Sequence, residues 1–130
     1  RVYKLKRDFK KNKIIINGGF THTDYRKNII DNVDGIMIGR EAYKNPWIFN
    51  KNINKKDKEM KKNIIIIYLN FLKENFSKYT FNKNALNHIQ NAFNGHEGAK
   101  EWRKKVGKTI INKDLKYLLN YIECANINIL

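Results

Sequence analysis

The chain has very little of what a disulfide scaffold, a metal centre or a membrane anchor requires. Its 130 residues include one cysteine, one proline and three histidines. The single cysteine, Cys124, excludes an intramolecular disulfide and is typical of a reducing compartment. The longest apolar run, residues 64–69, is far shorter than the roughly 20 residues that span a bilayer. We therefore expect an intracellular protein, cytoplasmic or organellar, without a membrane span.

The sequence also lacks the usual arrangements of catalytic and metal-binding side chains. No pair of histidines has metal-ligand spacing with carboxylates or with Cys124, so no metal is expected. No Ser/His/Asp arrangement and no carboxylate pair suited to acid–base catalysis is present. We expect Cys124 to be a small buried side chain rather than a nucleophile.

Acidic residues are scarce relative to basic ones. The chain has 12 Asp and Glu against 27 Lys and Arg, which gives a formal net charge of +15. An excess of this size favours binding to a polyanion, because neutralising phosphates releases condensed counterions. The alternative is a compositional bias, since asparagine and lysine are abundant throughout the chain. Charge alone therefore supports nucleic-acid binding only weakly.

Two short apolar runs each end in a glycine turn, at residues 14–19 and 35–40. Both are predicted to be buried parallel strands, joined by a helical crossover of about 15 residues. Strands followed by such turns form the phosphate site at the end of a (β/α)8 barrel. Backbone N–H groups of Asn17, Gly18 and Gly19 would approach an anion, and Gly39 and Arg40 would repeat the device one strand later. Two ordinary strand–helix turns are the alternative.

The composition changes near residues 50–58, which are polar and lack apolar periodicity. Residues 1–56 are predicted to be the last two βα units of a (β/α)8 TIM barrel, with an amphipathic helix over residues 1–9. Residues 57–130 are predicted to be a small helical bundle, so the fold class is α/β plus all-α. Apolar stripes predict four helices, with the following members: Met60, Ile64, Ile67, Phe71 and Leu72; Ala85, Leu86, Ile89 and Phe93 within 82–93; Ala99, Trp102, Val106 and Ile110; and Leu115, Leu118, Leu119 and Ile122. Trp47 is expected at the end of the barrel.

The third of these helices carries a basic edge. Lys100 and Arg103 lie three residues apart and so share one side of the helix. Lys104 and Lys108 extend this surface, and the glycine before the helix leaves its first N–H groups open to phosphate. His96 lies in the preceding turn, where an RNA contact is conceivable. A solvated basic face is the alternative interpretation.

Together these segments resemble the C-terminal part of tRNA-dihydrouridine synthases, most closely the A-type branch. The resemblance is carried by residues 2–9, 16–19, 33–43 with 45–46, and 98–104. It implies a flavin-dependent TIM barrel followed by a helical domain that binds tRNA. Members of this family reduce the C5=C6 bond of a D-loop uridine with FMN, a cysteine proton donor and NADPH.

By this resemblance, Asn17, Gly18, Gly19, Gly39 and Arg40 hold the FMN phosphate. Lys100 and Arg103 correspond to the pair that orients tRNA. The proton-donating cysteine and the residues around the flavin ring belong to earlier barrel strands, and Cys124 does not match them. No catalytic residue is therefore expected in this chain. We expect a C-terminal fragment that is inactive alone and needs the remaining barrel half for a complete site.

Two other interpretations stay open at this point. The chain could be a free-standing basic helical RNA-binding module with a non-catalytic α/β scaffold. It could also belong to a different phosphate-binding barrel, such as another flavin oxidoreductase, although the basic helix has no use in a barrel that acts on a small substrate.

Overall fold

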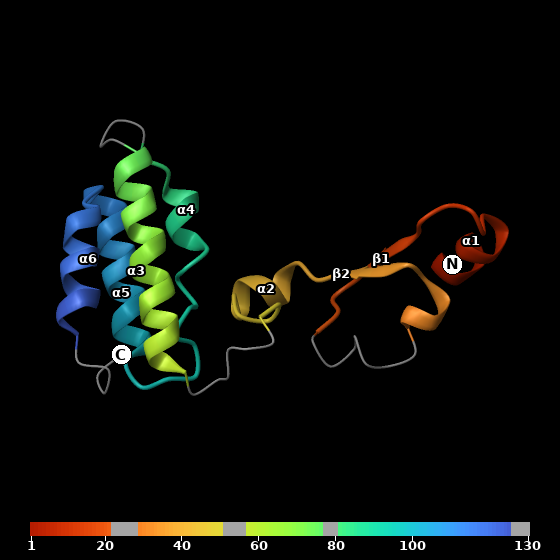
Figure 1. Ribbon diagram of the computed structural model, residues 1–130, viewed down its shortest axis with the longest axis horizontal. Coiled ribbons are helices and arrows are strands. Elements are labelled where there is room, and N and C mark those ends of the chain that lie inside the picture. Colours follow the sequence, from red (N-terminus) through yellow and green to blue (C-terminus); the bar gives the residue numbers. More distant parts are fainter. Residues whose placement is uncertain (22–28, 51–56, 77–80, 126–130) are drawn as a thin grey trace. The chain divides into compact units, whose positions relative to one another are not determined.

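A two-stranded parallel sheet and a helical bundle form two units, Arg1–Lys44 and Asn45–Leu130 (Figure 1). The computed structural model describes residues 1–21, 29–50, 57–76 and 81–125. The predicted change from an α/β part to a helical part is present in the order of the elements. The predicted boundary at residue 56 lies outside the described residues and stays a prediction.

The first unit places the two predicted strands side by side. Its elements are α1 (Val2–Asp8), β1 (Ile15–Asn17), the 3-10 helix η2 (Ile30–Asn32), β2 (Gly35–Met37) and α2 (Arg40–Lys44). The strands pair in parallel, with Ile15 opposite Gly35 and Asn17 opposite Met37. Most of the predicted crossover helix, residues 22–28, lies outside the described residues. The parallel pairing is as predicted, and the assignment of these elements to a barrel stays a prediction.

The strands are not buried, which corrects the expectation drawn from their apolar composition. Ile15 is 64% exposed and Met37 is 52% exposed. The apolar residues Leu5 and Phe9 in and after α1 are exposed as well. A sheet of two strands is too small to bury both of its faces. Its β-branched residues, which are typical of a covered sheet, are therefore left partly exposed to solvent.

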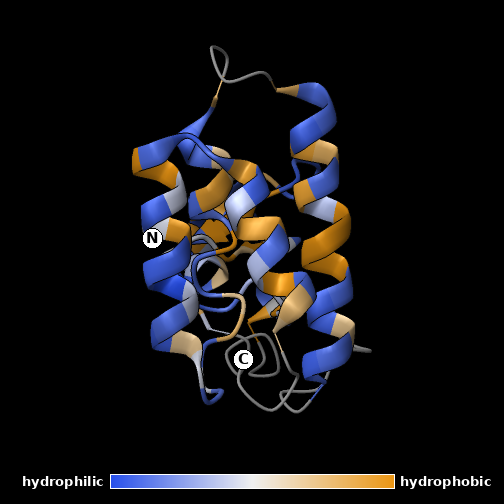
Figure 2. Ribbon diagram, turned by 90° about the vertical axis from the view of Figure 1, so that its left-hand side faces the viewer, coloured by the Kyte–Doolittle hydropathy of each residue, from blue (hydrophilic) through white to orange (hydrophobic). Residues whose placement is uncertain are grey.

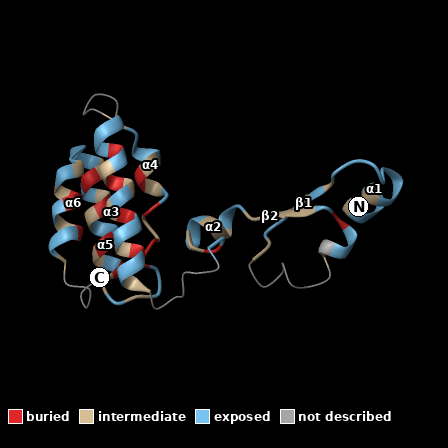
Figure 3. Ribbon diagram, in the orientation of Figure 1, coloured by how far each residue is buried: buried red, intermediate tan, exposed pale blue. Residues whose placement is uncertain are grey.

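The second unit buries its core between four helices, α3 (Lys58–Asn75), α4 (Lys83–Asn87), α5 (Ala99–Asn112) and α6 (Leu115–Cys124) (Figure 3). Helix α6 packs against both α3 and α5, and α4 packs against α5. The stripes predicted for α5 and α6 are confirmed, because Trp102, Val106, Leu118 and Ile122 are fully buried. The side chain of Asp114 caps α6 by accepting a hydrogen bond from the Tyr117 amide.

Helix α3 forms as predicted but buries a different face. Of the predicted stripe only Leu72 is buried, together with Lys61, Ile65 and Leu69. The exposed positions are Met60, Ile64, Ile67 and Phe71. The four consecutive isoleucines at residues 64–67 cover every side of α3, because successive residues of a helix are about 100° apart. The sequence therefore does not specify which side of α3 faces the core. Figure 2 shows how apolar and polar residues alternate along the helices.

The helix predicted over residues 82–93 is shorter than expected. Asn82 caps α4, as its side chain accepts a hydrogen bond from the Asn84 amide at 2.9 Å. After Asn87 the chain continues in turns with i to i+3 hydrogen bonds, although Ile89 and Phe93 are buried as predicted. Burial of the stripe was therefore predictable, whereas continuation of the helix was not.

Two single residues also differ from expectation. Trp47 packs against the helical core instead of ending a barrel, and its indole N–H donates to the Ala92 carbonyl at 2.6 Å. Cys124 is exposed. It follows the buried Ile122 by two positions, which turns it roughly 200° around the helix and away from the core.

Candidate functional site

The two glycine turns lie at one edge of the sheet. Because β1 and β2 are parallel, their carboxyl ends coincide, and the register places Asn17 beside Met37. Gly19 has φ +67°, a left-handed conformation that favours glycine. A Cβ atom there would lie 3.3 Å from Nη2 of Arg40. The structure therefore brings the guanidinium of Arg40 against Gly19, although the two residues are distant in sequence.

The rest of this turn region is open. Asn17, Gly18, Gly39 and Arg40 are exposed. A Cβ atom at Gly39 would meet no described atom within 4 Å, so the space beside its backbone is empty. An exposed guanidinium next to accessible glycine backbone suits an anion with several oxygens, such as phosphate.

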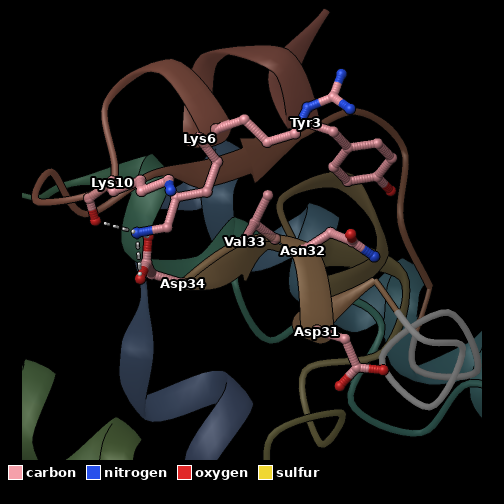
Figure 4. A pocket seen from close by; sticks show the side chains of 8 residues that line it. Tyr3, Lys6, Lys10, Asp31, Asn32, Val33 and Asp34 are labelled. Carbon is pink, nitrogen blue, oxygen red and sulfur yellow. Dashed lines mark hydrogen bonds and ion pairs between the residues drawn. The ribbon is translucent and has the colours of Figure 1, made fainter.

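A hydrogen-bond network that sequence reasoning missed fixes the opposite ends of the strands. The Asp34 carboxylate accepts from the Ile14 amide at 2.7 Å and pairs with the Lys6 ammonium at 2.7 Å. Lys6 also donates to the carbonyl of Lys10 (Figure 4) and to that of Asn12. The hydrogen bond from Ile14, followed by the interaction with Lys6, lowers the pKa of Asp34. This network aligns α1 with both strands at the edge away from the glycine turns.

The network borders an open hollow in the first unit (Figure 4). Its lining residues are Tyr3, Lys6, Arg7, Lys10, Asp31, Asn32, Val33 and Asp34. Lys6 and Asp34 both line this hollow and pair directly with each other. We assign the network a structural role, because its central charges are already paired.

In the helical unit, Trp102 fixes the face that α5 presents outward. Its side chain is fully buried, its indole N–H donates to the Ile89 carbonyl at 2.8 Å, and its ring meets Phe93 edge-on at 5.2 Å. Lys100 and Arg103 lie on the exposed side of the same helix. The structure therefore brings the two predicted RNA-binding residues together on one accessible edge, as the i, i+3 spacing indicated.

His96 points into the helical unit and not toward a ligand. Its Nε2 lies 2.9 Å from the ammonium of Lys61, which is only 3% exposed. Burial, followed by the charges of Lys61 and Lys58, lowers the pKa of His96. Burial also lowers the pKa of Lys61. An ammonium only donates, so the imidazole accepts and is neutral in this pair, and the RNA contact considered for His96 is not supported.

The two remaining histidines are His22 and His88. His88 is exposed, and His22 lies outside the described residues. Within the described ranges, no group of three or more His, Cys, Asp or Glu side chains could hold a metal ion. No helix in the described part of the chain is long and apolar enough to cross a membrane.

Comparisons with known proteins agree with the sequence resemblance. The family described as "Dihydrouridine synthase (Dus)" matches residues 1–127. A Haemophilus ducreyi protein named tRNA-dihydrouridine(20/20a) synthase is 33% identical over 114 residues, covering 83% of this chain and 35% of the relative. Proteins of the same name from Synechocystis and Escherichia coli K12 are 32% and 31% identical, and the matches cover 85% and 80% of this chain. The chain spans about a third of the length of these relatives.

Proposed function

This chain belongs to the dihydrouridine synthase family, and from that membership we propose that it supplies two parts of a tRNA-dihydrouridine synthase. Residues at the glycine turns hold the phosphate of FMN, and helix α5 binds tRNA. The complete protein, with the remaining barrel strands, reduces a D-loop uridine to dihydrouridine at the expense of NADPH. Residues outside this chain carry the reaction itself.

The contact between Gly19 and Arg40 carries the first half of this proposal. A phosphate group needs donors that converge without a side chain in the way, and the Arg40 guanidinium supplies a forked pair of N–H groups beside a glycine. Gly39 leaves the neighbouring backbone accessible. Asn17, Gly18, Gly19, Gly39 and Arg40 therefore fit the phosphate of FMN, and would hold the cofactor from its phosphate end.

When bound, FMN supplies the hydride for reduction of the uridine C5=C6 bond. The contribution of this chain is to bind and orient. Arg40 compensates the phosphate charge, and the fixed turn at Gly19 sets where that charge lies. Cys124 is exposed at the end of α6 in the helical unit and is given no role in proton transfer.

The exposed edge of α5 carries the second half. Lys100 and Arg103 are exposed and aligned, and α5 is anchored from behind by Trp102. Such an edge contacts backbone phosphates, which position an RNA without reading its sequence. The uridine that reacts must leave its stack to reach the flavin. We therefore infer that contacts outside the flavin site hold the rest of the tRNA in place.

The flavin assignment is tested on the complete protein that contains this chain. Arg40→Ala should purify without flavin absorbance, and Arg40→Lys should retain less flavin than the unaltered protein because it loses the forked geometry. Lys44→Ala, at the other end of the same short helix, is the matched control and should keep its flavin. Full flavin content in Arg40→Ala would overturn the phosphate site. An unaltered complete protein that binds tRNA but never flavin would favour the RNA-binding module instead.

The tRNA assignment is tested by filter binding across a salt series. Replacing both Lys100 and Arg103 by alanine should weaken tRNA binding by at least about tenfold and reduce the salt slope by about 2. Unchanged affinity would remove this edge from the interface. The full chain of 130 residues should form no dihydrouridine by itself, and turnover by it would refute the proposed division of labour.

A further inference from the structure

Two lysines of α5 and two tyrosines of α6 interleave on the side of the bundle where these helices pack together. The ammonium of Lys105 lies 5.0 Å from the ring centre of Tyr121 and 5.6 Å from that of Tyr117. The ammonium of Lys108 lies 5.1 Å from the ring centre of Tyr117. We call Lys105, Lys108, Tyr117 and Tyr121 the lysine–tyrosine patch.

The patch is held in place by its own contacts. The i, i+3 spacing of the lysines and the i, i+4 spacing of the tyrosines align each pair on one side of its helix. Glu101 pairs with Lys105 at 3.5 Å and with Lys104 at 3.7 Å. A hydrogen bond with Tyr117 is the largest contribution that raises the pKa of Lys105, so this lysine stays charged. These restraints lower the entropy that the side chains would lose on binding a ligand.

The charge of the patch is only partly neutralised. Glu101 pairs with Lys104 and Lys105, and the carboxylate of Asp114 accepts from the Tyr117 amide. Lys108 is exposed and has no ion pair within the described residues. The patch therefore keeps a net positive charge next to aromatic rings that are half-buried.

Lysines interleaved with aromatic rings suit a ligand that offers both negative charge and a flat face. Unpaired nucleotides offer both, because the phosphate binds the ammonium groups and the base stacks on a ring. An acidic protein segment would satisfy the charges but leave the rings unused. Lys100 and Lys108 are eight positions apart on α5, which is roughly 12 Å along the helix axis. One RNA can therefore span both surfaces.

We propose that the lysine–tyrosine patch is a second RNA-contact surface, which binds the backbone and an unpaired base of the same tRNA that Lys100 and Arg103 contact. This inference rests on the proposed function, because it assumes that tRNA is the ligand of α5. It adds a contact on the α6 side of the helix and assigns Lys108 to phosphate. Lys108 lies over the Tyr117 ring in the free chain, so a base would stack on Tyr117 once Lys108 has turned from the ring to a phosphate.

The test measures tRNA binding by the full chain across a salt series. Lys108→Ala should weaken binding about threefold to tenfold and reduce the salt slope by about 1. Tyr117→Leu should weaken binding about tenfold, because a stacking ring is lost. Tyr117→Phe keeps the ring and should retain most of the affinity. Lys73→Ala, an exposed lysine in the last turn of α3, is the matched control for lost charge.

The outcomes separate this inference from the proposed function. If replacing Lys100 and Arg103 weakens binding while Lys108→Ala behaves like Lys73→Ala, the patch is wrong and the proposed function stands. If the patch variants weaken binding and the Lys100 and Arg103 variant does not, the patch is the main RNA surface. If Tyr117→Leu binds as well as Tyr117→Phe, or if polyglutamate displaces tRNA from the patch, the stacking assignment is overturned. Circular dichroism of each variant checks that the helices are intact.

Discussion

Replacing Trp102 by phenylalanine tests whether this residue organises the helical unit. Trp102 is fully buried, its ring meets Phe93 edge-on, and its indole N–H satisfies the carbonyl of Ile89. Ile89 itself is 6% exposed, so water has little access to its surroundings. Phenylalanine keeps an aromatic ring at this position but removes the donor and part of the volume.

The expected cost follows from two losses. The Ile89 carbonyl also accepts from the Ala92 amide at 3.0 Å and keeps that donor. The lost indole hydrogen bond therefore costs about 0.5–1.5 kcal/mol. The smaller ring leaves a space that the neighbours fill incompletely, which adds about 1 kcal/mol. Trp102→Phe should therefore lower the free energy of unfolding by about 1.5–2.5 kcal/mol. With a urea dependence of about 1–2 kcal/mol per molar, the midpoint should fall by roughly 1–2.5 M.

The measurement is a urea titration of the full chain followed by circular dichroism of the helices. Trp47→Phe is the matched control, because its indole also donates to a carbonyl, that of Ala92, from a half-buried position. Ala92 is 1% exposed, so its carbonyl is shielded from water as well, and this variant should cost about 1–3 kcal/mol through the lost hydrogen bond. If Trp102→Phe lowers the midpoint by less than about 0.5 M, Trp102 does not organise the bundle, and its role behind the basic edge of α5 is lost.

Three further predictions concern the first unit and the half-buried His96. Gly19→Ala should lower the free energy of unfolding by about 1–2 kcal/mol, because the residue has a positive φ, and should displace Arg40. Gly39→Ala should leave thermal stability unchanged. In the complete protein we expect both variants to lose flavin and only Gly19→Ala to melt at a lower temperature, so equal melting temperatures would contradict this prediction. The pKa of His96 is lowered in the folded protein, so on acidification the unfolded state takes up the proton first, and the free energy of unfolding should fall as the pH drops below 6.5. The glutamine of His96→Gln can still accept from Lys61 but does not titrate, so this variant should lose the pH dependence. Identical pH profiles of the variant and the unaltered chain in urea titrations would refute the pairing. Asp34→Ala should speed exchange of the Ile14 amide with deuterium, and an unaltered exchange rate would exclude the hydrogen bond as the restraint on β1.

Helices α5 and α6 were predictable because each sequence has only one apolar side that can face the core. In α5 the apolar residues Trp102 and Val106 recur on one side, while charged residues occupy half of the other positions. In α6, Leu118 and Ile122 do the same after an aspartate cap. A single apolar stripe with a clear start leaves no second face to bury.

The candidate phosphate site was predictable for a related reason. Two glycine turns at the carboxyl ends of neighbouring parallel strands lie at the same edge of a sheet, so the proximity of the two turns follows from strand pairing and direction. The particular contact of Gly19 with Arg40 comes from the structure. The link between Lys6 and Asp34 could not be predicted in this way. An isolated lysine and an isolated aspartate have many possible partners, and only the path of the chain selects one.

Helix α3 shows why a pattern with two apolar faces fails. The stripe through Ile64 and Ile67 contains no charge, yet the structure buries the side that carries Lys61. Burying an ammonium is costly unless it is partnered, so this choice requires compensation from other segments. His96 accepts from Lys61, and the ring of Trp47 lies 6.0 Å from its ammonium. Those partners come from the turns before α5 and from the segment after α2, so the buried face of α3 was decided by residues that its own sequence does not contain.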